Sequence, residues 1–243
     1  MLSEIKHFVK TRFNDIILFI IVMLLFPDGN RRWAKQKGLI ALNGHLQGYH
    51  NLLDFSEWCK NRGVKVLTAF GFSTENWNRT KEEVNYLMNL LEKCLVDNAE
   101  KYIKDGIKVR IIGQKERLPE SLQKAIEKTE KATENNSSLF LNFAISYGGK
   151  WDILQAVKKI VQDKISVEKI DENLFESYLS TVGLPTPDFI IRAGGEKRMS
   201  NFVLWQAAYS ELYFCPKLWP DFTEKDLDDA LTEFNHRQRR FGK

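Results

Sequence analysis

The chain has 243 residues, of which 43% are hydrophobic and 28% are charged. These are ordinary values for a globular protein, and they exclude a disordered chain, a collagen-like repeat and a polytopic membrane protein. The net charge of +4 suits anionic small ligands but is too small for a dedicated nucleic-acid binder, so we expect no nucleic-acid partner. Three cysteines without metal-ligand spacing indicate neither disulfides nor a zinc site, which favours a reducing compartment and a cytoplasmic protein.

An apolar run, Ile16–Phe26, lies near the start of the chain behind a basic stretch and is superficially similar to a signal peptide. No small-x-small cleavage site follows, and the run is well short of the ~20 residues that a helix needs to span a bilayer. It is rich in β-branched residues and stops at Pro27-Asp28-Gly29-Asn30, as a buried parallel strand does when it ends in a turn. We therefore predict a strand here rather than an export or anchor segment, preceded by an N-terminal helical extension over residues 1–15.

Strand-like and helix-like segments alternate along the rest of the chain. Short apolar runs predict further strands at Val64–Phe70, Ile107–Ile112, Leu139–Ile145, Asp188–Ile191 and Glu211–Phe214. Helical patterns follow residue 33 and cover Thr80 to about Lys104, Pro119 to Asn136, Trp151–Val161 and Glu224–Arg239. This alternation predicts an α/β fold, since parallel strands need long crossover connections and helices supply them. No linker or repeat divides the chain, so we expect one domain over residues 16–243, with helices on both faces of a mostly parallel sheet.

The turn after the first strand carries charges that suit a bound phosphate. In an open parallel sheet, ligands bind beyond the carboxyl ends of the strands, so the residues there are the candidates for chemistry. Asp28-Gly29-Asn30-Arg31-Arg32-Trp33 combines a glycine turn with two arginines at the start of a helix, which is a phosphate site on physical grounds. Asp28 would repel a bare phosphate, which implies a divalent cation between them. The alternative, that Asp28 and Asn30 only cap the helix, stays open at this point.

Two later loops add polar groups near strand ends. Gly71–Arg79 carries a hydroxyl, a carboxylate, an indole and a guanidinium, which indicates either a functional loop or an elaborate helix cap. Arg192–Asn201 places paired glycines among three cations, a second anion cradle, and Glu211 follows at the start of the last strand. We expect the two cradles and the two isolated acids, Asp28 and Glu211, to meet at one edge of the sheet, beside a helix with an apolar face. That combination indicates a substrate with a diphosphate head and a hydrocarbon tail.

Several longer segments carry a family resemblance. The chain has no Walker A sequence, no G-x-G-x-x-G and no G-x-S-x-G, which weighs against P-loop NTPases, dinucleotide oxidoreductases and α/β-hydrolases. It does contain, in this order, PDGNRRWAKQKGL, GHLQG, FSTENWNRT, SYGGKWD, IRAGGEKRMSNFVLWQAAYSELYF and RRFGK. By these segments the sequence from about Ile16 to Lys243 resembles the cis-prenyltransferases, the undecaprenyl diphosphate synthase family.

The resemblance implies both a reaction and an architecture. The reaction joins isopentenyl diphosphate to C1 of an allylic diphosphate, releases pyrophosphate and forms a cis double bond. The architecture is a single α/β domain with a central, mostly parallel six-stranded sheet, a hydrophobic tunnel for the growing chain, and a homodimer. One face of the strand with Leu139, Leu141 and Phe143 is expected to line the tunnel. The lipid product implies peripheral contact with a membrane.

The resemblance also implies a role for each candidate residue. Asp28 works with Mg²⁺ at the allylic diphosphate, whose phosphates are held by the adjoining segment with Gly29, Arg31, Arg32 and Trp33. The polar group near the transferred proton consists of Asn30, His45 and Ser73. The isopentenyl diphosphate is held by Arg192, Arg198 and Ser200, with Glu211 as a second acid at the metal. A flexible loop that closes over the substrates contains Glu75, Trp77 and Arg79.

Some of these residues have plain structural alternatives. His45 is alternatively a histidine that is hydrogen-bonded within a helix, and Trp77 is alternatively a core aromatic. The terminal Arg240-Phe241-Gly242 is alternatively a solvated basic tail. A non-catalytic scaffold subunit of a prenyltransferase is a further alternative for the whole chain, but the metal acid Asp28 is intact, which argues against it.

Three positions depart from the family pattern. Pro27 stands where a methionine is usual, Ala41 where a basic residue usually helps to hold the allylic diphosphate, and Ala193 where a threonine is usual. Pro27 and the Arg-Met-Ser segment resemble the small subgroup that makes branched, lavandulyl-type diphosphates. That subgroup lacks the loop glutamate and tryptophan that are present here as Glu75 and Trp77. We therefore expect ordinary head-to-tail elongation, with irregular coupling as the alternative.

Overall fold

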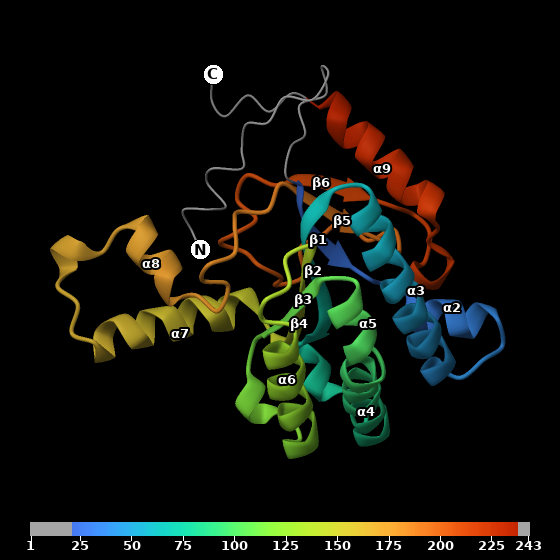
Figure 1. Ribbon diagram of the computed structural model, residues 1–243, viewed down its shortest axis with the longest axis horizontal. Helices are drawn as coiled ribbons and strands as arrows, with labels where there is room; N and C mark the ends of the chain where they lie inside the picture. Colours follow the sequence, from blue (N-terminus) through green and yellow to red (C-terminus); the bar gives the residue numbers. More distant parts are fainter. Residues whose placement is uncertain (1–20, 238–243) are drawn as a thin grey trace.

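Six parallel strands form the central sheet of the protein, which a computed structural model describes over residues 21–237 (Figure 1). Their spatial order is β3-β4-β2-β1-β5-β6, and every neighbouring pair is parallel. The strands are β1 (Ile21–Phe26), β2 (Val64–Ser73), β3 (Ile107–Ile112), β4 (Leu139–Tyr147), β5 (Phe189–Arg192) and β6 (Glu211–Phe214). The predicted α/β fold is confirmed, and the sheet is entirely parallel rather than mostly so. The predicted extension over residues 1–15, the start of the first predicted strand and the terminal basic tail lie outside the described residues.

Helices connect the strands and cover both faces of the sheet (Figure 1). The α-helices are α2 (Asn30–Gln36), α3 (Ala41–Asn61), α4 (Lys81–Asp97), α5 (Ala99–Lys104), α6 (Glu120–Ala132), α7 (Gly149–Gln162), α8 (Glu172–Tyr178) and α9 (Glu224–His236). Short 3-10 helices are η1 (Thr74–Asn78), η2 (Lys115–Arg117), η3 (Val167–Lys169) and η4 (Trp219–Asp221). In Figure 1, α7 and α8 extend away from the sheet, on the side opposite to α2. Across the described residues, no helix is both long and apolar enough to cross a bilayer.

Two helical features differ from the sequence-based expectations. The sequence pattern did not predict α3. This helix begins without a side-chain cap and buries Gly44, His45, Gly48 and Asn51 along with its apolar residues. Polar residues and glycines on the inner face weaken the apolar periodicity by which an amphipathic helix is recognised. The helix predicted from Thr80 to Lys104 is divided into α4 and α5 at Asn98. The Asn98 side-chain amide donates hydrogen bonds to the Tyr49 hydroxyl and the Cys94 carbonyl at this break.

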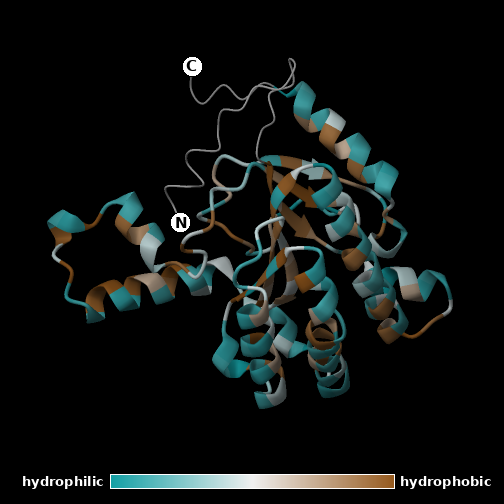
Figure 2. Ribbon diagram, viewed as in Figure 1, coloured by the Kyte–Doolittle hydropathy of each residue, from teal (hydrophilic) through white to brown (hydrophobic). Residues whose placement is uncertain are grey.

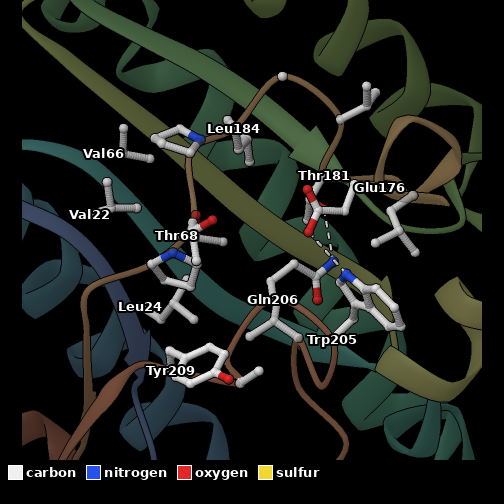
Figure 3. A pocket seen from close by; sticks show the side chains of 18 of the residues that line it. Val22, Leu24, Val66, Thr68, Glu176, Thr181, Leu184, Trp205, Gln206 and Tyr209 are labelled. Carbon is white, nitrogen blue, oxygen red and sulfur yellow. Dashed lines mark hydrogen bonds between the residues drawn. The ribbon is translucent and has the colours of Figure 1, made fainter. Parts of the chain in front are cut away.

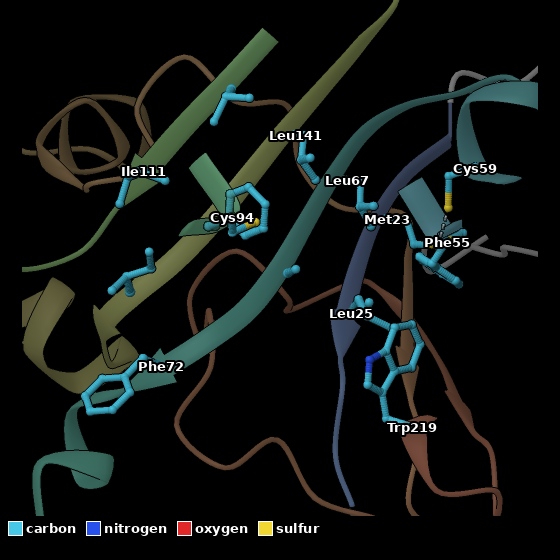
Figure 4. Close-up of a cluster of buried hydrophobic side chains, with 14 of the residues drawn as sticks. Met23, Leu25, Phe55, Cys59, Leu67, Phe72, Cys94, Ile111, Leu141 and Trp219 are labelled. Atoms are coloured by element: carbon cyan, nitrogen blue, oxygen red, sulfur yellow. Dashed lines mark hydrogen bonds between the residues drawn. The ribbon is translucent and has the colours of Figure 1, made fainter. Parts of the chain in front are cut away.

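The sheet is buried on both faces, because alternate residues of each strand point to opposite sides. Met23 and Leu25 of β1 belong to the larger core, on the side that also buries Trp219 (Figure 4). Leu24 and Phe26 belong to a smaller core on the other side. Burial on both faces explains why β1 is a continuous apolar run rather than an alternating one. Figure 2 shows the same pattern, with mostly hydrophobic strands at the centre and outer helices in which hydrophilic and hydrophobic residues alternate.

Close packing of α2 against α3 depends on two glycines in α3. A Cβ atom at Gly44 would lie 2.0 Å from the carbonyl oxygen of Asn30, and one at Gly48 would lie 2.4 Å from the Asn30 side-chain oxygen. A side chain at Gly44 would force the helices apart, and one at Gly48 would displace the side chain of Asn30. The segment GHLQG therefore fixes the place of Asn30 at the start of α2.

Replacing Gly44 by alanine tests this packing. Gly44→Ala should lower the free energy of unfolding by about 1–3 kcal/mol, because overpacking against backbone outweighs the ~1 kcal/mol that alanine gains in helix propensity. Urea denaturation measures the change. Gln47→Ala, on the exposed side of the same helix, is the matched control and should not destabilise the protein. A Gly44→Ala protein as stable as the wild type would contradict the close approach.

Candidate active site

A cavity of about 510 Å³ lies at the carboxyl ends of β1, β2 and β5, where the sequence predicts the chemistry. Its lining includes most of the predicted polar site residues, namely Asp28, Asn30, His45, Ser73, Glu75, Arg79, Arg192 and Ser200. Phe26, Phe70 and Leu87 supply apolar lining. A polar part and an apolar part in one cavity suit a ligand with an anionic head and a hydrocarbon tail.

A larger cavity of about 710 Å³ lies on the face of the sheet opposite to α3 (Figure 3). Its lining includes Val22 and Leu24 of β1. The Gln206 amide, which also lines it, donates a hydrogen bond to the Thr181 hydroxyl at 2.8 Å. None of the predicted site residues lines this cavity, so the smaller cavity is the candidate active site.

The turn after β1 brings Asp28 to the cavity. Gly29 precedes α2 with a φ of 107°, and a Cβ atom there would lie 2.8 Å from the Leu218 side chain, so the turn requires glycine. One Asp28 oxygen accepts a hydrogen bond from Arg192 Nη2 at 2.8 Å, and the other lies 3.6 Å from Arg32 Nη2. Asp28 is therefore more than a helix cap, because it joins the end of β1 to the end of β5.

The loop after β5 forms the second predicted cradle. Arg192 is only 4% exposed and also donates to the Ser200 hydroxyl at 2.8 Å and to the Arg198 carbonyl. The Arg198 side chain pairs with Glu196, which lies 3.2 Å from Arg32. Glu196 therefore holds one arginine from each cradle. The Nε atom of Arg192 is buried and has no hydrogen-bond partner among the described residues.

Buried Glu83 gathers three of the predicted site residues. One of its carboxylate oxygens accepts from His45 Nε2 at 3.0 Å and from Arg79 Nη1 at 3.0 Å, and lies 3.8 Å from Arg31 Nε. Burial opposes ionisation of Glu83, but these partners hold its pKa below the usual value. Glu83 was not among the predicted site residues. Its spacing from Thr80 is that of a helix cap, and the Thr80 hydroxyl does accept a bond from the Glu83 backbone N–H. Capping spacing gave no sign of the second role.

His45 is neutral at pH 7 in this environment. Burial lowers its pKa below the ordinary value of about 6.5, although the hydrogen bond with Glu83 acts in the opposite direction. A neutral imidazole that donates through Nε2 keeps its other nitrogen free of a proton. His45 thus has the hydrogen bond expected of a structural histidine, and it also lies in the cavity lining with the other predicted site residues. Ala41, one turn earlier, begins α3.

The loop after β2 is anchored by side-chain contacts. Ser73 and Glu75 line the cavity, and Glu75 accepts a hydrogen bond from Asn201 Nδ2 at 2.8 Å. Trp77 donates to the Ser146 hydroxyl at 2.9 Å and packs edge-on against Phe72. Trp77 is therefore placed as a partly buried core aromatic and does not line the cavity.

Two further predicted residues lie apart from the cavity. The Trp33 indole donates to Asp221 at 2.7 Å, which ties α2 to η4. The expectation that Glu211 shares an edge of the sheet with Asp28 is wrong. Glu211 begins β6 in register with Phe189, the first residue of β5, so it lies near the amino ends of the strands. There it pairs with Arg237 at 2.9 Å, and its role as a metal ligand remains a prediction.

The donor set near Asp28 suits Mg²⁺ bound together with a substrate. Within residues 21–237, no group of three or more histidine, cysteine, aspartate or glutamate side chains comes together. Mg²⁺ commonly binds through one or two carboxylates, substrate phosphates and water, so a full protein cage is not required. The Asp28 carboxylate is 35% exposed and lines the cavity, so it fits such an ion.

The pKa of His45 provides a test of the Glu83 contact. Glu83→Gln keeps a hydrogen-bond acceptor but removes the charge that stabilises the imidazolium, so the pKa of His45 should fall further. NMR titration measures the pKa, with His45→Gln to assign the signal and the exposed Glu82→Gln as the control.

The lowered pKa of His45 also predicts how the stability of the protein depends on pH. The folded-state pKa of His45 lies below the unfolded value, so the unfolded chain binds more protons and the protein loses stability as the pH falls below about 6.5. In Glu83→Gln, this loss of stability should continue to a lower pH than in the wild type. A higher pKa of His45 in Glu83→Gln would contradict the contact.

Comparisons with known proteins show the family to which this chain belongs. A family model described as "Putative undecaprenyl diphosphate synthase" matches residues 26–242. An isoprenyl transferase of Aquifex aeolicus is 47% identical over 90% of this chain and 94% of its own length. A chloroplastic (2Z,6Z)-farnesyl diphosphate synthase of Solanum lycopersicum is 48% identical over 90% of this chain and 77% of its own length. The crystal structure of lavandulyl diphosphate synthase from Lavandula x intermedia with dimethylallyl diphosphate has a TM-score of 0.89 and 38% identity, over 93% of this chain and 99% of that chain. This chain therefore belongs to the undecaprenyl diphosphate synthase family and is a prenyltransferase of the cis-prenyl type.

Proposed function

We propose that this chain joins isopentenyl diphosphate to an allylic diphosphate head to tail, with Mg²⁺ at Asp28. The observation that carries the proposal is the ion pair between Arg192 and Asp28, because it joins the ends of the two strands that the predicted diphosphate cradles follow, and both residues line the cavity. The named relatives support it, since one is a (2Z,6Z)-farnesyl diphosphate synthase and one structure contains dimethylallyl diphosphate.

The chain's own residues divide the work between the two substrates. The Gly29 turn and Arg32 hold the allylic diphosphate, while Arg192, Arg198 and Ser200 hold the isopentenyl diphosphate. Fixed cations at the departing pyrophosphate stabilise the charge that develops there. When bound, Mg²⁺ supplies further positive charge to the phosphate oxygens of the leaving group.

The reaction also requires removal of a proton. The bond from C1 of the allylic substrate to its diphosphate breaks, C4 of isopentenyl diphosphate bonds to C1, and C2 of isopentenyl diphosphate loses a proton. Asn30, His45 and Ser73 line the cavity together. The imidazole of His45 is suited to orient or receive that proton, because burial favours its unprotonated form.

The hydrocarbon tail is proposed to leave the polar part of the cavity along its apolar lining. Phe26, Phe70 and Leu87 begin this path. Leu87 lies in the same core as Leu141 and Phe143 of β4, the residues expected to face a tunnel. A growing chain in that direction would displace or pass between core side chains.

Regular coupling is favoured over irregular coupling by the loop after β2. Glu75 lines the cavity and is held by Asn201, so the loop glutamate that distinguishes this chain from the lavandulyl-type pattern has a defined place. Irregular coupling is the second candidate, because Pro27 also lines the cavity and the lavandulyl diphosphate synthase structure matches closely. Pro27 removes a backbone donor and restricts φ immediately before Asp28.

A homodimer is proposed to cover apolar side chains on α7 and the segment that follows it. Leu154 and Val161 of α7 are 57% and 69% exposed, and Val167 is 78% exposed. Surfaces of this kind are typical of contacts between proteins. Localisation in the cytoplasm, with membrane contact through the lipid product, completes the proposal.

Product analysis tests the function directly. The purified chain with dimethylallyl and isopentenyl diphosphates should release pyrophosphate and yield a linear product with a cis double bond, whose skeleton NMR identifies. A panel of longer allylic primers should establish which primer is preferred. EDTA should stop turnover, and added Mg²⁺ should restore it. A branched lavandulyl skeleton would overturn regular coupling, and the absence of any condensation with Mg²⁺ present would overturn the enzyme assignment.

Asp28→Asn tests the proposed metal acid. Asparagine keeps an oxygen for Arg192 but removes the charge, so the fold should survive while turnover falls by about 10²-fold or more. A steady-state Mg²⁺ titration measures the loss, circular dichroism checks the fold, and Asp229→Asn on exposed α9 is the control. Near-normal turnover of Asp28→Asn at saturating Mg²⁺ would show that another residue has this role.

A further inference from the structure

Asn201 stands between the two loops of the candidate active site and has no role in the family pattern described above. It follows Ser200, and both residues have positive φ angles, 45° for Ser200 and 63° for Asn201. Asparagine tolerates this left-handed conformation better than most residues with a side chain. Asn201 lines the cavity together with Ser200 and Glu75.

The side chain of Asn201 makes two different hydrogen bonds. Its Nδ2 donates to Glu75 Oε1 at 2.8 Å, and its Oδ1 accepts from the backbone N–H of Lys150 at 2.8 Å. Its backbone carbonyl accepts from Gly149 at 2.6 Å. One residue therefore holds the loop after β2 and the first turn of α7.

Gly148 leaves room for the contact between Asn201 and the loop after β2. A Cβ atom at Gly148 would lie 2.7 Å from Asn201 Nδ2 and 2.6 Å from the Thr74 hydroxyl. The glycine thus leaves the space in which Asn201 meets the loop. The hydrogen bond to Glu75 also helps to hold the pKa of that carboxyl below its usual value, against the effect of burial.

A continuous chain of contacts passes through this residue. Asp28 binds Arg192, and Arg192 binds Ser200. Asn201 is the next residue, and it binds Glu75. Any ligand that settles on Ser200 therefore bears on the position of Asn201 and, through it, on the loop with Glu75.

We propose that Asn201 is a positioning residue that couples occupation of the isopentenyl diphosphate site to closure of the loop of residues 73–79. This rests on the proposed function, which assigns Arg198 and Ser200 to the isopentenyl diphosphate. In this role, Asn201 contacts no reacting atom. It transmits the binding event by keeping Glu75 attached to the loop after β5.

A pair of substitutions separates the two hydrogen bonds of Asn201. Asn201→Asp keeps the oxygen that Lys150 needs and tolerates the left-handed backbone, but it places a carboxylate against Glu75. The double variant Asn201→Asp with Glu75→Gln restores a hydrogen bond in the reverse direction, because the glutamine amide donates to the aspartate. Glu75→Gln alone keeps an acceptor for Asn201 and is the matched reference.

Hydrogen–deuterium exchange measures the coupling without turnover. Isopentenyl diphosphate alone, without an allylic primer, should slow amide exchange in residues 73–79 of the wild type and of Glu75→Gln. In Asn201→Asp that slowing should weaken by about tenfold, the value of one hydrogen bond to a charged group, and in the double variant it should return. Turnover should fall in Asn201→Asp and recover in the double variant to the level of Glu75→Gln. Thermal unfolding of each variant checks that the fold is retained.

The outcomes distinguish this inference from the function on which it rests. If peptides covering Arg192 to Ser200 are protected but residues 73–79 are not, isopentenyl diphosphate binds as proposed and the coupling is refuted. Equal protection of the loop in the wild type and in Asn201→Asp also refutes it. If neither region is protected, the proposed isopentenyl diphosphate site is wrong, and the inference falls with it.

Discussion

The geometry of the site depends on one buried guanidinium, that of Arg192 at the end of β5. It is 4% exposed, lies 4.8 Å from the ring centroid of Phe26, and binds Asp28 and the loop that carries Ser200. A buried charge without a partner is strongly unfavourable, so the end of β1 and the loop after β5 are held wherever Arg192 can reach both. The two proposed diphosphate sites come from distant parts of the chain, and they adjoin because one buried cation binds oxygen atoms of both.

Two glycines, Gly29 and Gly194, impose a second constraint on the same site, because neither has a side chain. A Cβ atom at Gly194 would lie 2.7 Å from Arg32 Nη2, and one at Gly29 would strike the Leu218 side chain. Both glycines also have positive φ angles. Arg32 can therefore approach Asp28 only because Gly194 has no side chain, and the Gly29 turn can pack against Leu218 for the same reason. Motifs that look like phosphate-binding glycines in the sequence serve here to bring cations and an acid together.

The sequence predicted the sheet well because buried parallel strands are continuous apolar runs, and Ile107–Ile112 and Glu211–Phe214 were placed at their observed bounds. It failed at α3, whose inner face mixes glycine and polar residues with apolar ones. The cavity residues could be foreseen because they follow strands at their carboxyl ends. Glu211 was misplaced for the converse reason, since it is the first residue of its strand and so lies at the amino end. Glu83 could not be foreseen, because its contact with His45 depends on the packing of two helices.

The charges of the site are balanced within the protein itself. Arg192 and Arg32 face Asp28, Arg198 faces Glu196, and Arg79 faces Glu83. An entering diphosphate must therefore displace a carboxylate from its arginine during at least part of its binding. Otherwise a metal ion must bind together with the diphosphate and neutralise the acid. Such exchange lowers ground-state affinity but keeps the arginines oriented before the substrate arrives, so little reorganisation is required when charge develops on the leaving pyrophosphate. At Asp28, the proposed Mg²⁺ would neutralise the acid, whereas Glu196 and Glu83 hold arginines in place.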